Sequence, residues 1–337
     1  MNYFITGGTG LIGTHLANLL HEVHPEAKIY NLDIVEPGTP LPTVKNYKPA
    51  LGKGEEHAAT FIYCDVRQPI ELEKVDITPD DVIFNFAAVH RTPGHPDPAY
   101  FETNIRGAEN VCAFAERHGI RKIVFTSSIA PYGAAEELKE ETTLPMPNTP
   151  YGISKLVAEK IHQTWQAGGE GRQLTIVRPG VVFGRGENGN FTRLYWGIRG
   201  HKFMYPGRKD TIKACIYVKE LVRFMLYRLE YHDSGVELYN CCYEPAYTIE
   251  HIVESMKRVT NMKVKVPFMP GWLIMTAAGI AGALGSPMGI CPARVRKLQI
   301  STNICGKKLS ASGYRFHYTF EEALADWYKD NGNLYLQ

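Results

Sequence analysis

Short apolar runs alternate with stretches of helical periodicity along the first half of this chain. The apolar runs predict strands at Tyr3–Ile5, Lys28–Leu32, Thr60–Cys64, Asp81–Phe86, Lys122–Thr126 and Leu174–Val177. Apolar residues three and four positions apart predict helices at Leu11–Leu20, Ala99–His118 and Pro150–Gln166. Strands that alternate with helices in this way indicate an α/β fold with a parallel sheet and crossover helices.

Two segments interrupt this alternation. Glu36–His57 is rich in Pro and Gly, which predicts a long surface loop. Past Pro179 the alternation weakens and turns rich in Gly and Asn appear. We therefore expect residues 1–180 to form the sheet domain, with 212–243 returning to it. Residues 181–211 and 244–337 are expected to form a smaller C-terminal lobe that binds the substrate.

A glycine-rich turn joins the first predicted strand to the first predicted helix. Its sequence is Gly8-Thr9-Gly10-Leu11-Ile12-Gly13. Glycine lets backbone N–H groups and the helix N-terminus approach a pyrophosphate closely. A strand, this turn and a helix in succession predict a dinucleotide site in a doubly wound parallel sheet of the Rossmann type, with Gly7, Gly10, Leu11 and Ile12 as its lining.

An acid follows the second predicted strand. Asp33 lies about 20 residues after the last glycine, where a carboxylate accepts hydrogen bonds from the ribose hydroxyls of an adenosine. A 2′-phosphate would be repelled by Asp33, and no Arg or Lys follows directly to bind one. The sequence thus predicts NAD, rather than NADP, as the cofactor.

The charge balance and cysteine content narrow the class of protein. Lys and Arg number 37 and Asp and Glu 35, a formal charge of +2, which argues against nucleic acid as a partner. Met1 leads directly into the first strand without a basic leader, so we expect a cytoplasmic location. The seven Cys contain no CxxC pair, which predicts reduced, mostly buried thiols and no metal site.

One apolar, nearly uncharged segment lies at Gly271–Leu284. It is shorter than the roughly 20 apolar residues that a membrane span requires, and Pro270 and Pro287 bracket it. We therefore expect no membrane span. The segment predicts a buried helix that lines a pocket or a subunit contact, and a helix lying in the plane of a membrane surface is the alternative.

Candidate catalytic groups lie where the last of the predicted helices begins. Tyr151 and Lys155 are four residues apart, which places both side chains on one helix face. A phenol has a reference pKa of about 10, but an adjacent ammonium and a cationic nicotinamide both favour the phenolate. Ser128 follows the strand that ends at Thr126, at the carboxyl edge of the sheet. We expect Tyr151 to take a proton from a substrate hydroxyl, Lys155 to favour its phenolate and Ser128 to hold the reacting oxygen.

Together with Asn85-Phe86-Ala87-Ala88, these motifs in this order resemble the extended short-chain dehydrogenase/reductase family over nearly the whole chain. The resemblance implies that Lys155 also holds the nicotinamide ribose. It further implies that Asp65 and its neighbour Val66 contact the adenine. Further cofactor contacts are implied for Ala87 and Ala88 after the fourth strand, for Asn104 on the following helix and for Pro179 in the Arg-Pro turn. For Ala87, Ala88 and Asn104, sheet packing and helix capping are the alternative roles.

The positions just after Ser128 discriminate between reactions. Sugar-nucleotide 4,6-dehydratases carry an Asp-Glu pair there, whereas this chain has Ile129 and Ala130, which exchange no proton. The glutamate of decarboxylating relatives and the cysteine of the GDP-fucose synthase type are also missing. The resemblance therefore implies hydride chemistry at a single carbinol, either 4-epimerisation or a net oxidation or reduction.

The substrate side resembles UDP-galactose 4-epimerase relatives. Asn190 matches the residue that binds the diphosphate of a nucleotide sugar there, and Lys213 stands where the family usually has Arg. Arg294, with Arg296, is the candidate for the missing guanidinium, and a solvated helix face is its alternative role. The resemblance implies a nucleotide sugar as substrate and a homodimer formed through the two long predicted helices.

Two other functions remain open at this stage. The apolar C-terminal third also resembles the branch with 3β-hydroxysteroid dehydrogenase, whose substrates are small apolar alcohols. A non-catalytic dinucleotide sensor is the other alternative, although such proteins usually lose the tyrosine or the lysine that this chain retains at Tyr151 and Lys155.

Overall fold

A parallel sheet of seven strands forms the centre of the computed structural model, which describes residues 1–39, 48–51, 54–90, 94–133, 135–233, 235–273, 276 and 299–337. The strand order is β11-β7-β5-β4-β1-β2-β3, and every neighbouring pair is parallel. The bounds are β1 Asn2–Thr6, β2 Lys28–Asp33, β3 Thr60–Tyr63, β4 Val82–Asn85, β5 Lys122–Thr126, β7 Gln173–Pro179 and β11 Val236–Cys241. This is the doubly wound α/β sheet that the alternating pattern predicts.

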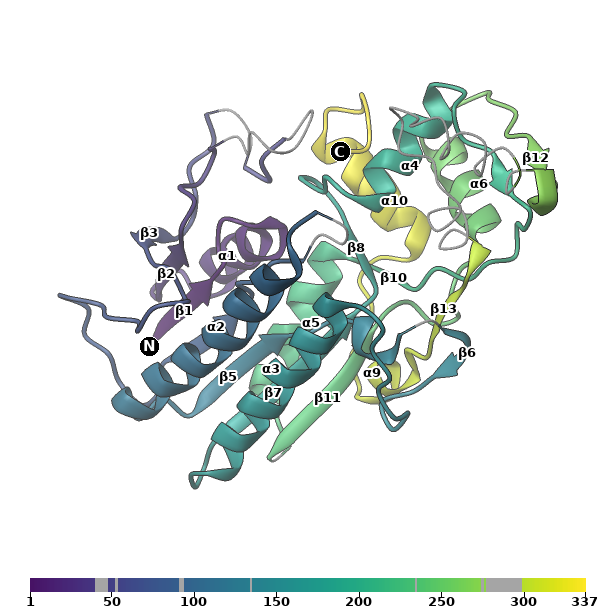
Figure 1. The fold of residues 1–337 in the computed structure, drawn as a ribbon. Coiled ribbons are helices and arrows are strands. Elements are labelled where there is room, and N and C mark those ends of the chain that lie inside the picture. Colours follow the sequence, from purple (N-terminus) through teal and green to yellow (C-terminus); the bar gives the residue numbers. More distant parts are fainter. Residues whose placement is uncertain are drawn as a thin grey trace.

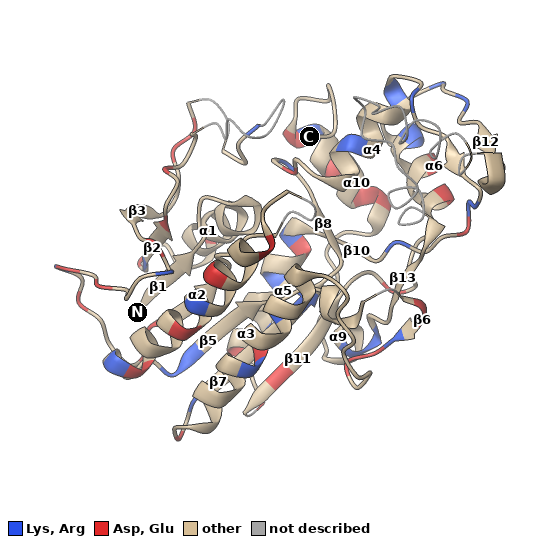
Figure 2. Ribbon diagram, in the orientation of Figure 1, with Lys and Arg blue, Asp and Glu red and all other residues tan. Residues whose placement is uncertain are grey.

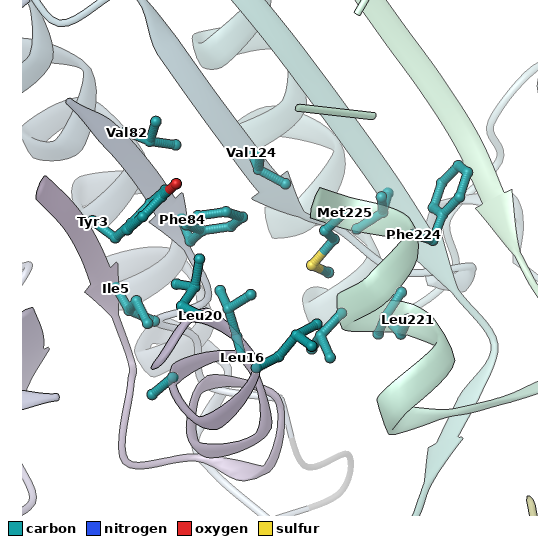
Figure 3. Packing of buried hydrophobic residues seen from close by; sticks show 14 of the residues in the cluster. Tyr3, Ile5, Leu16, Leu20, Val82, Phe84, Val124, Leu221, Phe224 and Met225 are labelled. Carbon is teal, nitrogen blue, oxygen red and sulfur yellow. The ribbon is translucent and has the colours of Figure 1, made fainter. Parts of the chain in front are cut away.

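Helices cover both faces of the sheet (Figure 1). On one face α1 (Leu11–Val23) packs against α5 (Val218–Glu230), and on the other α2 (Asp97–His118) packs against α3 (Pro150–Ala167). Figure 3 shows the first of these cores, in which Leu16 and Leu20 of α1 meet the sheet residue Phe84 and Met225 of α5. All four side chains are buried, because the apolar face of each helix covers the apolar face of the strands.

Segments from the second half of the chain, together with one strand from the first half, build a smaller lobe at the carboxyl end of the strands (Figure 1). Its helices are α4 (Asn190–Arg199), α6 (Ile249–Val259) and α10 (Phe320–Asp330), with α9 (Lys307–Ala311) beside β11. Its strands form three pairs: β8 (Val181–Phe183) with β10 (Cys215–Tyr217), β9 (Tyr205–Pro206) with β12 (Phe268–Met269), and β6 (Ala135–Lys139) with β13 (Thr302–Ile304). A short 3-10 helix, Ala130–Tyr132, follows β5.

Residues 48–51 of the predicted surface loop are packed rather than exposed, whereas Glu36, Gly38, Thr39 and 54–56 at its two ends are exposed, as predicted. Ala50 and Leu51 are buried, and Lys48 exchanges two hydrogen bonds with Asn188: its N–H donates to Oδ1 at 2.9 Å, and its carbonyl accepts from Nδ2 at 2.6 Å. The expectation of a surface loop is therefore wrong for these residues. Pro and Gly content indicates a loop, but it carries no information on which distant segment the loop contacts.

Within the described residues, no helix is long and apolar enough to cross a membrane. The apolar segment Gly271–Leu284 lies outside them, apart from Gly271, Trp272, Leu273 and Thr276. Among the described cysteines Cys64 is partly buried, and the others, Cys112, Cys215, Cys241, Cys242 and Cys305, are buried, as the sequence predicts.

Candidate active site

The glycine turn between β1 and α1 has a backbone that only glycine accommodates. Gly7 has φ +71°, and a Cβ on it would lie 2.8 Å from the backbone nitrogen of Ala87. The turn thus brings Gly7 against Ala87 at the end of β4. Gly10 caps α1 without a side-chain hydrogen bond, so the first N–H groups of the helix have no side-chain acceptor at this cap. A narrow turn that opens on a helix N-terminus fits a pyrophosphate.

Asp33 ends β2 beside this turn. Its Oδ2 accepts a hydrogen bond from the N–H of Thr9 at 3.1 Å, and its Oδ1 accepts one from the N–H of Val35 at the same distance. Burial raises the pKa of the carboxyl group, and the backbone N–H groups of Val35 and Thr9 oppose that rise. The acid is therefore fixed against the glycine turn, which is the placement required for the ribose of an adenosine.

The other predicted cofactor residues differ in what their side chains already contact. Both carboxylate oxygens of Asp65 accept hydrogen bonds from Arg67, at 2.6 to 3.0 Å, and this guanidinium lowers the pKa of Asp65. Val66 is buried beside Gly107 of α2. Ala87 and Ala88 follow β4 and are partly exposed, and Pro179 ends β7.

Asn104 joins three elements. Its Oδ1 accepts from the N–H of Val89 at 2.8 Å, and its Nδ2 donates to the Val89 carbonyl at 3.1 Å and to Oγ of Ser154 at 2.8 Å. Both N–H groups of the amide are thus committed to neighbours within the protein. Asn104 on α2 thereby positions the segment after β4 against α3.

Tyr151 and Lys155 both lie on α3, as their spacing predicts, and Tyr151 lies close to Ser128. Tyr151 lies in the first turn of α3, where the Oγ of Thr149 accepts from the N–H of Gly152 and caps the helix. Burial raises the pKa of Tyr151 to about 12, and a hydrogen bond with Ser128 acts in the opposite direction. The Oγ of Ser128 also accepts the N–H of Ala130 at 3.1 Å. The phenol is therefore protonated in the protein alone.

Lys155 lies one helical turn further along α3 and is buried, with only 2% of its surface exposed. Its Nζ lies 4.3 Å from the ring centroid of Phe125, a cation–π contact. Burial lowers the pKa of Lys155 to about 7, although the nearby Glu159 carboxylate raises it. Near neutral pH the side chain therefore exists in both its charged and its neutral form, and nearby charges shift the proportion of the two.

A buried ion pair that the sequence did not predict lies next to Lys155. Glu159 of α3 accepts hydrogen bonds from Nε and Nη2 of Arg178 at 2.8 and 2.6 Å, and their side chains are 1% and 3% exposed. The hydroxyl of Ser127 also donates to Glu159. The spacing of Tyr151, Lys155 and Glu159 places all three on one helix face, which points to Glu159 but carries no information on its partner Arg178. This pair holds α3 against the end of β7.

Two of the predicted substrate residues, Asn190 and Lys213, lie in the smaller lobe. Asn190 is the first residue of α4, is exposed and accepts a hydrogen bond from Arg193 at 3.0 Å. Lys213 precedes β10, and its Nζ donates to the carbonyl of Ile300 at 2.7 Å. Arg294 and Arg296 lie outside the described residues.

The low pKa of Lys155 predicts a pH dependence of stability. The unfolded chain has the usual pKa of 10.5, so between pH 7 and 10.5 it holds this proton more tightly than the folded chain does. The contribution of Lys155 to the free energy of unfolding therefore rises with pH across that window. Urea midpoints of the wild type and of Lys155→Met, measured near both ends of the window without NAD, check this. The midpoint of the wild type should rise relative to that of Lys155→Met as the pH is raised. A difference that does not change with pH would contradict the assignment.

Comparisons with known proteins identify the family. The model of the NAD dependent epimerase/dehydratase family matches residues 3–242, which is more than half of the chain. The chain belongs to this family. A member from Escherichia coli O157:H7, N-acetyl-alpha-D-glucosaminyl-diphospho-ditrans,octacis-undecaprenol 4-epimerase, is 30% identical over 96% of this chain and 93% of its own length. A UDP-glucose 4-epimerase 3 from Oryza sativa subsp. japonica is 25% identical over 79% of this chain and 78% of its own.

Solved members of the family have the same fold. A UDP-galactose 4-epimerase superposes with a TM-score of 0.71 at 20% identity, over 99% of both chains. The UDP-N-acetylglucosamine 4-epimerase of Methanobrevibacter ruminantium gives 0.73 at 21%, over 98% of both. Other neighbours were solved with NAD, among them a UDP-glucose 4-epimerase from Thermus thermophilus. The predicted α/β fold, the predicted family and the assignment as an enzyme of the extended short-chain dehydrogenase type are confirmed.

Proposed function

We propose that this family member is an NAD-dependent 4-epimerase of a sugar carried on a diphosphate. The observation that carries the proposal is the closeness of the Tyr151 and Ser128 side chains, with Lys155 one turn away on α3. Ile129 and Ala130, which cannot exchange protons, restrict the site to hydride and proton transfer at one carbinol. The sugar epimerases among the relatives favour this function over the steroid alternative.

Tyr151 acts as the base and then as the acid. Its pKa of about 12 in the protein alone means that it holds its own proton there. Positive charge from Lys155 and an oxidised nicotinamide favours the phenolate, which can then accept the substrate proton. Ser128 holds the C4 oxygen through its hydroxyl while the proton moves to Tyr151. NAD, when bound, would supply the hydride acceptor for C4 and, once reduced, the hydride donor to the opposite face of the keto sugar, which inverts the configuration at C4. Tyr151 then gives the proton back to the same oxygen on the epimeric sugar.

The described residues fit NAD. The turn with Gly7, Gly10, Leu11 and Ile12 offers a close approach and N–H donors at the α1 cap for the pyrophosphate. Asp33 would accept the adenosine ribose hydroxyls, and Asp65 with Val66 would contact the adenine. The remaining members of the proposed site are Ala87, Ala88, Lys155 and Pro179 towards the nicotinamide, and Asn104 as a positioning residue.

Replacing Asp33 with Asn is expected to weaken NAD binding about 10- to 100-fold, because it removes charge-assisted hydrogen bonds to the ribose. The NAD that the purified protein retains through extended dialysis, quantified on denaturation, measures the loss. Asp80→Asn is the matched control, since Asp80 is 77% exposed in an ion pair with Arg121. An unchanged NAD affinity in Asp33→Asn would exclude this residue from the ribose site.

The names of the relatives indicate two kinds of carrier for the sugar: a nucleoside diphosphate and a polyprenyl diphosphate. Nucleotide sugars are named for the UDP-sugar epimerases, whereas the Escherichia coli relative, which matches nearly the whole chain, is named for a sugar on undecaprenyl diphosphate. Asn190, Lys213 and Arg294 are the proposed contacts for the diphosphate, which both carriers share. A lysine neutralises phosphate as a point charge, without the bidentate fork of arginine.

The test separates the reaction from the carrier. Purified protein is denatured and the released NAD is quantified, because an epimerase that recycles its cofactor retains it. The protein is then incubated with UDP-N-acetylglucosamine and, separately, with polyprenyl-diphospho-N-acetylglucosamine, and the sugar is analysed by chromatography. Formation of the C4 epimer from either carrier supports the proposal. Oxidised or reduced sugar with no epimer would refute it.

The proposal also includes a homodimer in the cytoplasm. The outer face of α3 exposes Ile153 and Val157, four residues apart and 40% and 37% exposed, next to α2. Apolar residues at this spacing suit a four-helix contact between two copies. The buried, unpaired cysteines suit a reducing compartment. Sedimentation velocity of the wild type and of Ile153→Glu with Val157→Glu tests the dimer, which should dissociate in the variant.

A further inference from the structure

Positive charge is concentrated in one part of the chain. Residues 255–320 contain no Asp or Glu. The Lys and Arg in this stretch are Lys257, Arg258, Lys263, Lys265, Arg294, Arg296, Lys297, Lys307, Lys308 and Arg315. The rest of the chain holds 27 Lys and Arg against all 35 Asp and Glu, so the formal charge of +2 conceals a basic segment within an acidic protein.

The described part of this segment presents two lysines without acidic partners. In the loop from α6 to β12, Met262, Val264 and Val266 pack against the core of the smaller lobe, while Lys263 and Lys265 between them are exposed. Among the described residues neither lysine has an ion pair with an acid. Figure 2 shows Lys and Arg along this loop at the outer edge of the lobe.

Large apolar side chains are exposed directly after these lysines. Phe268 of β12 is 51% exposed, Trp272 is 72% exposed and Leu273 is 41% exposed. β12 pairs with β9 at the outer edge of the lobe (Figure 1). We call Lys263, Lys265, Phe268, Trp272 and Leu273 the basic apolar edge. Its apolar members follow one another closely, unlike the singly scattered exposed apolar residues that are normal on a protein surface.

We propose that the basic apolar edge docks the enzyme onto a membrane that contains anionic phospholipid. Lysines attract acidic headgroups while their aliphatic stems lie along apolar surface, and tryptophan is enriched at the level of the headgroups. Apolar side chains beside basic ones are the combination with which proteins lie on such surfaces. The inference deepens the proposed function, since it brings the substrate lobe to the surface in which a lipid-carried sugar diphosphate resides.

The charge and the apolar side chains together favour a membrane over the other possible partners. A nucleic acid would bind the lysines but would leave Leu273 without an apolar partner. A second copy of the chain would place basic residues against the same basic residues, because a two-fold contact uses the same patch on both copies. An anionic membrane satisfies both parts of the surface at once.

The test is flotation of the full chain with vesicles of phosphatidylcholine alone and of phosphatidylcholine mixed with phosphatidylglycerol. We expect the wild type to float with the mixed vesicles at low salt and to be released as salt is raised. Lys263→Glu with Lys265→Glu should lower binding about tenfold or more. The control Lys28→Glu with Lys160→Glu has the same change in net charge at two exposed lysines elsewhere and should bind like the wild type.

A second pair of variants tests the apolar part. Trp272→Ser with Leu273→Ser should lower vesicle binding about tenfold. Leu144→Ser with Met146→Ser is the matched control, because these side chains are 77% and 72% exposed, and it should bind normally. Circular dichroism and retained NAD confirm that each variant is folded. Equal binding by variants and controls, no vesicle binding by the wild type, or binding to single-stranded DNA in place of vesicles would overturn the inference.

Failure of the inference and failure of the proposed function are distinguishable in the same samples. Vesicle binding is measured without substrate, and epimerisation is measured without vesicles on UDP-N-acetylglucosamine and on detergent-dispersed polyprenyl-diphospho-N-acetylglucosamine. Epimerisation without vesicle binding refutes the docking surface alone. Vesicle binding by a protein that epimerises neither substrate refutes the proposed reaction alone.

Discussion

Replacing Tyr151 with Phe is expected to lower the turnover of sugar epimerisation by about 10²- to 10⁴-fold, the usual contribution of a positioned acid–base group. The substitution removes only the hydroxyl that exchanges the proton and lies close to Ser128. The ring keeps its place beside Tyr100, at a centroid distance of 6.3 Å, so the NAD site should be unchanged. Turnover is measured by the rate of epimer formation, and NAD content by release on denaturation.

The matched control for this prediction is Tyr231→Phe. Tyr231 follows α5 and is 53% exposed, so loss of its hydroxyl should leave turnover and NAD content unchanged. If Tyr151→Phe turned over at the rate of the wild type, the proton would have to be taken by another group. If it lost NAD as well, the substitution would have disturbed the cofactor site, and Ser128→Ala would then be the variant that tests proton transfer with NAD still bound.

Replacing Glu159 with Gln is expected to lower the free energy of unfolding by about 3–5 kcal/mol, the usual cost of breaking a buried ion pair from one side. Glutamine has nearly the same shape, but it leaves the Arg178 guanidinium buried with Lys155 close by and no carboxylate to balance them. The loss of Glu159 also removes the charge that raises the pKa of Lys155, so this lysine should lose its proton more readily.

Urea unfolding followed by circular dichroism measures the effect of Glu159→Gln. Arg121→Ala is the control. The ion pair of Arg121 with Asp80 has an N–O distance of 2.7 Å, close to that of the buried pair, but its side chains are 52% and 77% exposed. Exposed pairs contribute about 0–1 kcal/mol, so the control should lie close to the wild type. A loss in Glu159→Gln as small as in Arg121→Ala would show that the buried pair does not hold α3 to the sheet.

The parts of the fold that depend on local pattern could be predicted from the sequence. The strand Lys122–Thr126 has the predicted bounds, and α3 extends one residue beyond the prediction, because apolar runs and helical spacing are properties of neighbouring residues. The juxtaposition of Tyr151 and Ser128 could also be predicted, since parallel strands end at one edge and α3 begins there.

Contacts between distant segments could not be predicted. The pair of Glu159 and Arg178 joins a helix to a strand that the sequence analysis treated separately, and only the folded chain brings the two together. Lys48 and Asn188 are likewise joined across a long stretch of chain. The net charge gave no sign of the basic segment in residues 255–320, because a sum over the whole chain does not show where the charges lie.

The central claim is that one carbinol of a sugar diphosphate is oxidised and reduced again at the same site, with Tyr151 moving the proton. The most direct measurement uses N-acetylglucosamine deuterated at C4, attached to UDP or to a polyprenyl diphosphate, and purified protein without added NAD. The account predicts a mixture of the two C4 epimers in which the product keeps its deuterium, with no accumulation of reduced NAD. Loss of the deuterium to solvent, or net oxidation of the sugar with no epimer formed, would contradict it.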